Sequence, residues 1–457
     1  MKRGWQLKRF GDICTFDKLQ ALHNHLPYVG LEHIESHTGR FIGSLDPQSV
    51  KSLTFRFSRN HVLYGRLRPY LNKVLVPDFE GHCSTEIFPI KPSPLLSREY
   101  LTYWLLSDTT VDHINATCTG ARMPRANMNE VLDFDFPLPP IPEQQRIVGI
   151  LDEAFAGIAT ARANAEKNLQ NARAVFESQL QAIFSHDAPD GSVISSEPTT
   201  KQLESKLQKT SAITNRYHPK HNEIVCADPL ATKTGGRHAT LQHIPGGFSL
   251  AVGMPKTQPK NGWRWSLLTD LARLESGHTP SRRHPEYWGG AIPWLGIRDA
   301  REWHGRRVDD TIQKINELGI ANSSARLLPA GTVCLSRTAS VGYVVVMGRQ
   351  MATSQDFVNW VCSDDIAPDF LKYLLMAGGR SEFLRFSNGS VHQTIYFPEV
   401  KAFHICHPHI HEQLRLVSIL DSLKDESEHL ESVYQKKLGT LDELKKSLLH
   451  QAFSGQL

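Results

Sequence analysis

One feature constrains the fold of this chain more than any other: the same helix start occurs twice. Residues 140–152 read PIPEQQRIVGILD, and residues 409–421 read HIHEQLRLVSILD. A shift of 269 positions superimposes the two segments, and the register then continues without a gap until Ser185 meets Ser454. A repeat of constant length indicates two copies of one structural unit.

Both copies predict a long helix with an apolar stripe. In the second copy, apolar residues recur with alternating spacings of four and three residues, which is typical of a coiled-coil seam. They are Leu416, Leu420, Leu423, Leu430, Tyr434, Leu441, Leu444 and Leu448. The first copy keeps this register with smaller residues, namely Ile147, Leu151, Ala154, Ile158, Ala161, Ala165, Asn168, Ala172, Val175, Gln179 and Ala182. Each helix would be on the order of 60 Å long. We expect the two helices to pack on each other; the alternative is that each packs on its own domain.

Composition sets the class of protein. A chain of 457 residues with 40% apolar content suggests two or more globular domains. No run of eighteen apolar residues exists, and no apolar region follows the basic start MKRGWQLKRF, so we expect a cytoplasmic protein. Seven cysteines without a CxxC pair predict buried thiols. The formal charge of +4 is too small to indicate a partner.

The segments that precede the two helices are also related, although more weakly. RGWQLKRFGDI (3–13) matches NGWRWSLLTDL (261–271), and VLYGRLRPYLNKVLV (62–76) matches VCLSRTASVGYVVVM (333–347). Similar pairs are LPYVGLEHI with IPWLGIRDA, CSTEIFPI with TSQDFVNW, and TCTGARMPRANMNEV with SNGSVHQTIYFPEV. Short β-branched and aromatic runs between Gly and Pro predict strands, with one helix in each copy around YLTYWLL and FLKYLLM. The predicted fold class is α+β and β-rich.

These patterns predict five consecutive parts. They are a first β-rich domain (1–140), a first long helix (141–185), a partly disordered linker rich in Ser, Thr and Lys (186–260), a second β-rich domain (261–408) and a second long helix (409–457).

This arrangement resembles the specificity subunit of type I restriction-modification systems. The specific marks are PLPPIPEQQRIVGILD at 137–152, its echo at 409–421, and SLLHQAFSGQL at 447–457. The resemblance implies two target-recognition domains in a pseudo-two-fold repeat, whose antiparallel helices set their spacing and dock two methyltransferase subunits. Restriction and translocase subunits would join through these. The chain would then be a non-catalytic, cofactor-free reader of a bipartite, asymmetric DNA site, serving DNA methylation and defence against foreign DNA.

A DNA reader must present basic and amide side chains on exposed loops, because phosphates and base edges are held by such groups. Both recognition segments contain such clusters in glycine-punctuated stretches. In the first, the candidates are Arg66, Arg68, Tyr70, Lys73, Arg122, Arg125 and Asn127. In the second, they are Arg298, Arg301, Arg337, Thr338, Ser340, His392 and Gln393. A solvated surface role is the alternative for each of them.

The repeated helix starts supply the candidates for partner binding. They are Glu143, Gln144 and Arg146 in the first copy, and Glu412, Gln413 and Arg415 in the second. The same residues recur at the same spacing, so we expect two equivalent docking surfaces for the methyltransferase subunits.

Other functions remain open at this point. The chain is not expected to be a methyltransferase, because PLPPIPEQ has prolines without the acid or amide and the aromatic of an amino-methyltransferase motif. LESK at 203–206 is only a fragment of a nuclease pattern. A coiled-coil protein-interaction scaffold and the recognition component of another methylation-based defence system are the alternatives.

A cluster of imidazoles and a thiol suggests a possible metal site. His404, Cys406, His407, His409 and His411 alternate in a way that could present zinc ligands on one side of a strand. No distant cluster completes a four-ligand set, so exposed imidazoles at a strand end are the favoured interpretation and no metal is expected.

If the two long helices pack on each other, their length should set the separation of the two DNA half-sites, and we call this role the ruler. Inserting one heptad near Asn168 and another near Lys437 should lengthen the pair by about 10 Å, or roughly three base pairs of DNA. A methylation map should then show unchanged half-sites at a new separation. New half-site sequences at the old separation would contradict the ruler.

Overall fold

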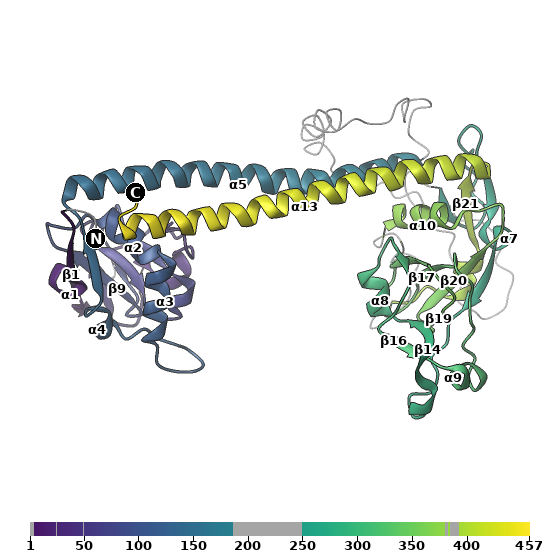
Figure 1. The fold of residues 1–457 in the computed structure, drawn as a ribbon, viewed down its shortest axis with the longest axis horizontal. Helices are drawn as coiled ribbons and strands as arrows, with labels where there is room; N and C mark the ends of the chain where they lie inside the picture. Colours follow the sequence, from purple (N-terminus) through teal and green to yellow (C-terminus); the bar gives the residue numbers. More distant parts are fainter. Residues whose placement is uncertain (1–3, 24, 49, 186–248, 380–382, 384–392) are drawn as a thin grey trace. The chain divides into compact units, whose positions relative to one another are not determined.

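The computed structural model describes residues 4–23, 25–48, 50–185, 249–379, 383 and 393–457. It divides into two compact units: unit 1 comprises Met1–Lys167 and Val433–Leu457, and unit 2 comprises Asn168–Ser432. Each unit is α+β and contains a stretch of both long helices, α5 (Ile141–Phe184) and α13 (Ile410–Ser454) (Figure 1). In the part of the chain that is described, no helix is both long and apolar enough to cross a membrane.

The two long helices pack against each other in antiparallel directions, as the seam predicted. In unit 1, Arg146 Nη2 donates to the Leu457 carbonyl at 2.8 Å, and Arg162 pairs with Asp442. In unit 2, Ser427 Oγ donates to the Ala172 carbonyl at 2.6 Å. The partner numbers in α13 fall as those in α5 rise. The small side chain of the buried Ala172 lets the two helices lie close together, so Ser427 of α13 reaches the Ala172 carbonyl of α5.

The predicted seam is wrong in the last third of α13. Leu444 was assigned to the seam but is 45% exposed, whereas Lys445 is partly buried there. Lys445 Nζ donates to the His37 carbonyl at 3.0 Å and lies 5.3 Å from the Phe155 ring. A strict 3.5-residue repeat drifts by about 20° per heptad around a helix of 3.6 residues per turn, so the buried stripe moves by one position.

Unit 1 contains three sheets, ordered β1-β10, β2-β9-β6-β7 and β3-β5-β8-β4. Its strands are β1 (Gln6–Arg9), β2 (Cys14–Phe16), β3 (Gln20–Ala21), β4 (Tyr28–Val29), β5 (Thr54–Phe57), β6 (Val62–Gly65), β7 (Val74–Leu75), β8 (Gly81–Cys83), β9 (Ile87–Pro92) and β10 (Asp135–Leu138). Its short helices are α1 (Phe10–Ile13), η1 (Leu31–His33), η2 (Pro69–Leu71), α2 (Arg98–Leu106), α3 (Asp108–Ala116) and α4 (Met128–Val131).

Unit 2 also contains three sheets, ordered β11-β21-β12, β13-β20-β17-β18-β15 and β16-β14-β19. Its strands are β11 (Leu250–Val252), β12 (Arg264–Leu267), β13 (Ala272–Ser276), β14 (Trp288–Leu295), β15 (Arg307–Val308), β16 (Gln313–Ile315), β17 (Val333–Ser336), β18 (Val344–Met347), β19 (Ala352–Thr353), β20 (Phe357–Cys362) and β21 (Phe403–His407). Its short helices are α7 (Leu268–Leu271), η4 (Pro285–Tyr287), α8 (Ile297–Glu302), α9 (Glu317–Ala321), α10 (Pro368–Ala377) and α12 (Phe397–Lys401).

The same sheet pattern occurs in both units. The antiparallel set β2-β9-β6-β7 matches β13-β20-β17-β18, and the parallel pair β4 with β8 matches the parallel pair β14 with β19. Most of these strand pairs come from segments that the sequence comparison had matched, and β2 and β13 directly follow a matched pair. The cores also correspond, because each unit buries one face of its sheets against the ends of α5 and α13.

The folded part of unit 2 starts earlier than the predicted boundary at residue 261. Strand β11 lies within the expected linker and pairs antiparallel with β21, with Leu250 opposite Ile405. Its three side chains are at most 4% exposed, so burial of this apolar triplet draws it into the core. Residues 186–248 of the expected linker lie outside the described residues.

A buried glutamine joins each helix start to the domain before it by hydrogen bonds, and we call this contact the glutamine latch. In unit 1, Gln144 Oε1 accepts from the Ser97 N–H at 2.8 Å, and Nε2 donates to the Leu95 and Pro139 carbonyls, each at 2.8 Å. In unit 2, Gln413 Oε1 accepts from the Ala367 N–H at 2.9 Å, and Nε2 donates to the Asp365 and Pro408 carbonyls, each at 3.0 Å. Both side chains are fully buried, so the proposed partner-binding role is wrong for Gln144 and Gln413.

A second latch recurs about two turns further along each helix. The Tyr103 hydroxyl of α2 donates to the Asp152 carboxylate of α5, and the Tyr373 hydroxyl of α10 donates to the Asp421 carboxylate of α13. Because Asp152 and Asp421 occupy equivalent repeat positions, each recognition domain is held to its helix pair at two matched points.

The glutamine latch predicts a large effect from a small change. Gln144→Ala leaves one buried N–H and two buried carbonyls without partners, which should lower the free energy of unfolding by about 2–4 kcal/mol. The exposed neighbour Gln145 gives the matched control, since Gln145→Ala should change it by less than about 0.5 kcal/mol. Calorimetric unfolding of both variants measures this, and equal losses would contradict the latch.

Candidate nucleic-acid interface

Three loops of unit 1 meet around the first residues after β6. The Arg66 N–H donates to the Glu86 carbonyl at 2.9 Å, and the Ala126 N–H donates to the Arg66 carbonyl at 2.9 Å. The Arg68 N–H donates to the Pro124 carbonyl at 2.8 Å. Main-chain hydrogen bonds therefore hold the loop after β6 between the β8–β9 turn and the loop before α4.

A carboxylate joins the side chains of this site. Glu86 Oε2 accepts from Arg66 Nε at 3.0 Å, and Glu86 Oε1 accepts from Arg125 Nε at 2.9 Å. Burial alone would raise the pKa of the Glu86 carboxyl, but the hydrogen bonds and charges of Arg125 and Arg66 outweigh it and hold that pKa below its usual value. The Arg66 guanidinium also lies 5.3 Å from the Phe88 ring. Both arginines are thus engaged inside the protein.

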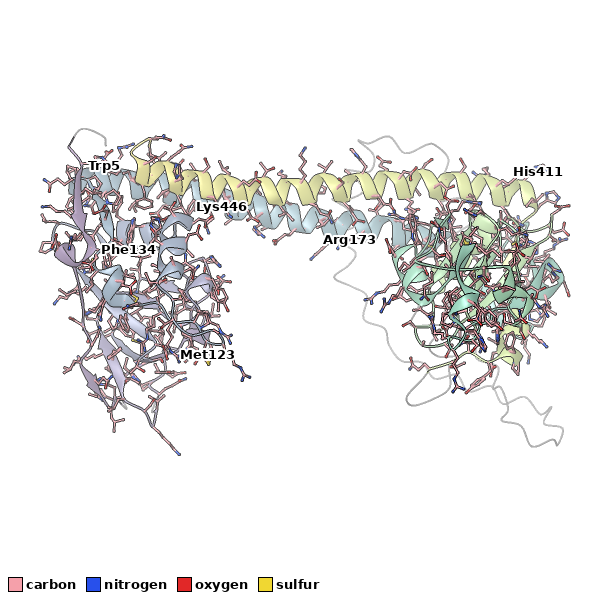
Figure 2. The ribbon with its side chains drawn as sticks, turned by 60° about the horizontal axis from the view of Figure 1, so that its bottom comes forward. Trp5, Met123, Phe134, Arg173, His411 and Lys446 are labelled. Atoms are coloured by element: carbon pink, nitrogen blue, oxygen red, sulfur yellow. The ribbon has the colours of Figure 1, made fainter. Side chains whose placement is uncertain are left out.

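Other side chains of the same loops face solvent. Arg68 and Arg122 are exposed, and Tyr70 and Met123 are 48% and 44% exposed. Figure 2 shows Met123 well away from the long helices of this unit. Arg68 has a left-handed backbone with φ of 51°, which is uncommon for a residue other than glycine. Cations and an aromatic ring at one exposed surface suit contacts with phosphates and bases.

Unit 2 builds the same junction with other side chains. The Arg337 N–H donates to the Asp356 carbonyl at 2.7 Å, and the Ile395 N–H donates to the Arg337 carbonyl at 2.9 Å. Thr338 and Thr394 share a hydrogen bond of 2.6 Å between their hydroxyls. The two units therefore share a main-chain frame in which the side chains vary.

Arg337 differs from its counterpart Arg66. Its guanidinium lies 4.9 Å from the Phe397 ring, and its Nε is buried without a hydrogen-bond partner among the described residues. Burial lowers the pKa of the Arg337 guanidinium, and the charges of Asp356 and Tyr396 offset this only in part. Asp356 instead accepts from Ser354 Oγ at 2.9 Å.

A family model decides what kind of protein this is. The model for the type I restriction modification DNA specificity domain matches residues 2–169 and again residues 260–436, which is most of the chain. The chain belongs to the type I restriction-modification specificity family. Each of the two matches ends inside a long helix, so each includes one recognition segment with its helix start.

Curated specificity subunits are similar to this family member. The MjaIX specificity subunit of Methanocaldococcus jannaschii is 30% identical over 36% of this chain and 39% of its own length. The EcoDI subunit of Escherichia coli is 29% identical over 39% of this chain and 40% of its own length. These two alignments thus span less than half of either relative. The HindI subunit of Haemophilus influenzae is 22% identical over 84% of this chain and 82% of its own.

Solved structures share the fold of this specificity-family chain. A chain from a study of complex assembly and conformational transition of the type I R-M system matches with a TM-score of 0.71 at 19% identity, covering 100% of this chain and 99% of that one. The HsdS subunit from Thermoanaerobacter tengcongensis matches with a TM-score of 0.59 at 18% identity, covering 100% and 98%.

The structure places the predicted DNA-binding residues of this specificity-family member in different settings. Arg68, Tyr70, Arg122, Arg298, Arg301 and Gln393 are exposed, while Arg66, Arg125, Arg337, Thr338 and Ser340 are partly buried at the loop junctions. His392 lies outside the described residues.

Two of the predicted DNA-binding residues make hydrogen bonds within unit 1. Lys73 Nζ donates to the Leu31 and Ile34 carbonyls at 2.6 and 2.8 Å, so its charge is used inside unit 1. Asn127 is the N-cap of α4: its side chain accepts from the Asn129 N–H at 3.2 Å. Lysine and asparagine in a loop satisfy buried backbone groups as readily as they bind nucleic acid.

Two polar residues near the unit 2 loops, Thr279 and Gln355, were not predicted from the sequence. Thr279 Oγ1 donates to Gln355 Oε1, and Gln355 is the exposed middle residue of the turn after β19. Arg282 donates to Gln313 Oε1 at 2.9 Å and lies 4.5 Å from the Trp288 ring. The match of CSTEI with TSQDF was the available signal for Gln355, because it marks the turn that carries Glu86 and Asp356.

The His and Cys cluster does not form a metal centre. Cys406 is buried in β21, and burial raises the pKa of its thiol to about 11. His407 Nε2 lies 3.0 Å from Ser266 Oγ, while His409 and His411 are exposed and stack 5.3 Å apart. Within the described residues, no three His, Cys, Asp or Glu side chains are grouped to hold a metal ion.

The Glu86 cluster predicts a pH-dependent contribution to stability. Because the folded pKa of Glu86 lies below its ordinary value near 4.5, its stabilisation is present above that pH and is lost as the pH falls through the folded pKa. Glu86→Gln should lower the free energy of unfolding by about 1 kcal/mol at pH 7, with a smaller gap below pH of about 4.5.

Denaturant unfolding of wild type and variant across this range measures the gap. The exposed pair of Glu80 with Arg56 provides the control, since Glu80→Gln should have little effect at any pH. A gap for Glu86→Gln that does not change with pH would contradict the assignment.

Proposed function

We propose that this chain is the DNA-sequence-recognition subunit of a type I restriction-modification complex. Each unit reads one half of a bipartite, asymmetric site through the loops around Arg66 and Arg337. The subunit itself is non-catalytic and needs no cofactor. It acts in the cytoplasm, where it delivers methylation to host DNA and restriction to foreign DNA.

One observation carries this proposal: the same main-chain junction occurs in both units with different exposed side chains. The equivalent hydrogen bonds at Arg66 and Arg337 fix the loop path. The exposed residue two positions later is Arg68 in unit 1 and Ala339 in unit 2. Two different half-sites require the same loop backbone with different exposed side chains, since base identity is read by side chains and not by the backbone.

The helix starts retain a docking surface for two methyltransferase subunits. Glu143 pairs with Arg146 at 2.7 Å, and Glu412 pairs with Arg415 at 2.6 Å, each with its arginine side chain about half exposed. With the glutamines buried, these matched charged pairs are the residues of the repeat that a partner can reach. Restriction and translocase subunits join through the methyltransferases.

Co-expression with an adenine methyltransferase from a neighbouring reading frame tests the function. Mapping methylated adenines in the host genome should give one asymmetric site with two half-sites at fixed separation. A chain that binds no duplex DNA together with such a partner would contradict the proposal and favour a protein-interaction scaffold.

The exposed arginine of the loop before α4 gives a specific prediction. Arg122→Ala should weaken binding of duplex DNA by roughly 1–3 kcal/mol if it contacts a base, or reduce the slope of log affinity against log salt by about 1 if it contacts a phosphate. Lys91→Ala, at the end of β9 far from Glu86, is the control and should change neither. Binding curves at several salt concentrations measure both quantities.

A further inference from the structure

The loops after β6 and β17 place different residues outward on the same path. Their first three residues are Arg66, Leu67 and Arg68 in unit 1, and Arg337, Thr338 and Ala339 in unit 2. The third residue is left-handed and exposed in both, with φ of 51° at Arg68 and 61° at Ala339. The outward third position therefore carries a guanidinium in unit 1 and only a methyl group in unit 2.

The first position shows the opposite pattern. Arg66 is held by the Glu86 carboxylate, which also binds Arg125. At the equivalent places, unit 2 has Asp356, one methylene shorter, and Thr394 instead of Arg125. Asp356 accepts a hydrogen bond from Ser354, and the ion pairs of the described residues include none between Asp356 and Arg337. The first arginine is thus bound by a carboxylate in unit 1, whereas in unit 2 the corresponding acid is bonded to a serine.

Arg337 is prepared for an outside acceptor. Its Nε is buried without a partner in the described residues, and Nη1 donates to the Ile395 carbonyl over a long 3.4 Å. The Phe397 ring, 4.9 Å away, supports one face of the guanidinium plane. A buried donor without an acceptor is costly, and a planar fork of donors matches guanine O6 and N7 in the major groove.

We propose that the base-reading arginine sits at the third loop position in unit 1, Arg68, and at the first in unit 2, Arg337. The acidic residue of the neighbouring turn determines which arginine is available to DNA, because Glu86 binds Arg66 whereas Asp356 leaves Arg337 available. Arg66 is then a positioning residue. This inference rests on the proposed DNA-recognition function and names guanine in duplex DNA as the target of both reading arginines.

The test uses the full chain, with its co-expressed methyltransferase, and a library of randomised duplex DNA. Arg68→Ala and Arg337→Ala should each lose preference for guanine at one position, in different half-sites, and weaken binding of the wild-type site about 5- to 150-fold. Melting temperatures should stay close to wild type. Arg66→Ala should lower the melting temperature and leave the selected sequence unchanged.

Two further variants separate reading from folding. Arg337→Lys keeps the charge but loses the planar fork, so it should lose the guanine preference while retaining most affinity for unrelated duplexes. Asp356→Glu combined with Thr394→Arg rebuilds the unit 1 clamp around Arg337 and should abolish the same preference as Arg337→Ala without lowering the melting temperature.

Four outcomes would go against the proposal. Unchanged base selection by Arg337→Ala, or loss of a guanine preference in Arg66→Ala at an unchanged melting temperature, overturns the assignment of reading arginines. Unchanged selection in the rebuilt clamp overturns the role of the turn acid. If the wild-type complex selects no sequence at all, the DNA-recognition function itself fails.

Discussion

The fold of each unit depends on one buried side-chain amide at the start of a long helix. Gln144 and Gln413 each use both ends of the amide to satisfy a strand-end carbonyl and two groups of the loop that leads into α2 or α10. A buried amide must find all of these partners together, so it specifies one orientation of helix and domain. This requirement accounts for the repeat of Glu-Gln at both helix starts.

The recognition segments contain two kinds of residue: those that contact the long helices and those in the loops far from them. Groups that contact the helices recur, as with Tyr103 and Tyr373 on their aspartates. Groups at the far loops do not, because their positions are kept by main-chain hydrogen bonds such as those at Arg66 and Arg337. Backbone donors and acceptors are the same for every residue, so side chains in these loops can change without moving the frame.

Electrostatics then decides which of the loop side chains are available. Glu86 binds two arginines that a count of basic residues would assign to DNA, whereas unit 2 leaves Arg337 with an unpaired Nε among the described residues. Partial burial strengthens both effects, since charges interact more strongly and lone donors cost more away from water. A single methylene between glutamate and aspartate is enough to alter the pairing.

The sequence by itself determined the two helices, their packing on each other, the α+β class and the matching of most strands between the units, because helix and strand periods are local and a repeat shows them twice. It also located the loops that carry Arg68 and Arg122. Only the tertiary structure decided that Leu444 faces solvent, that Gln144 and Gln413 are internal latches, that β11 belongs to unit 2, and that Lys73 and Asn127 serve the fold. Each of these outcomes depends on partners brought from other segments or on the slow drift of a 3.6-residue helix against a 3.5-residue pattern. Because a polar side chain bonds to whichever group the fold brings near it, its role is set by those neighbours, which a local pattern does not contain.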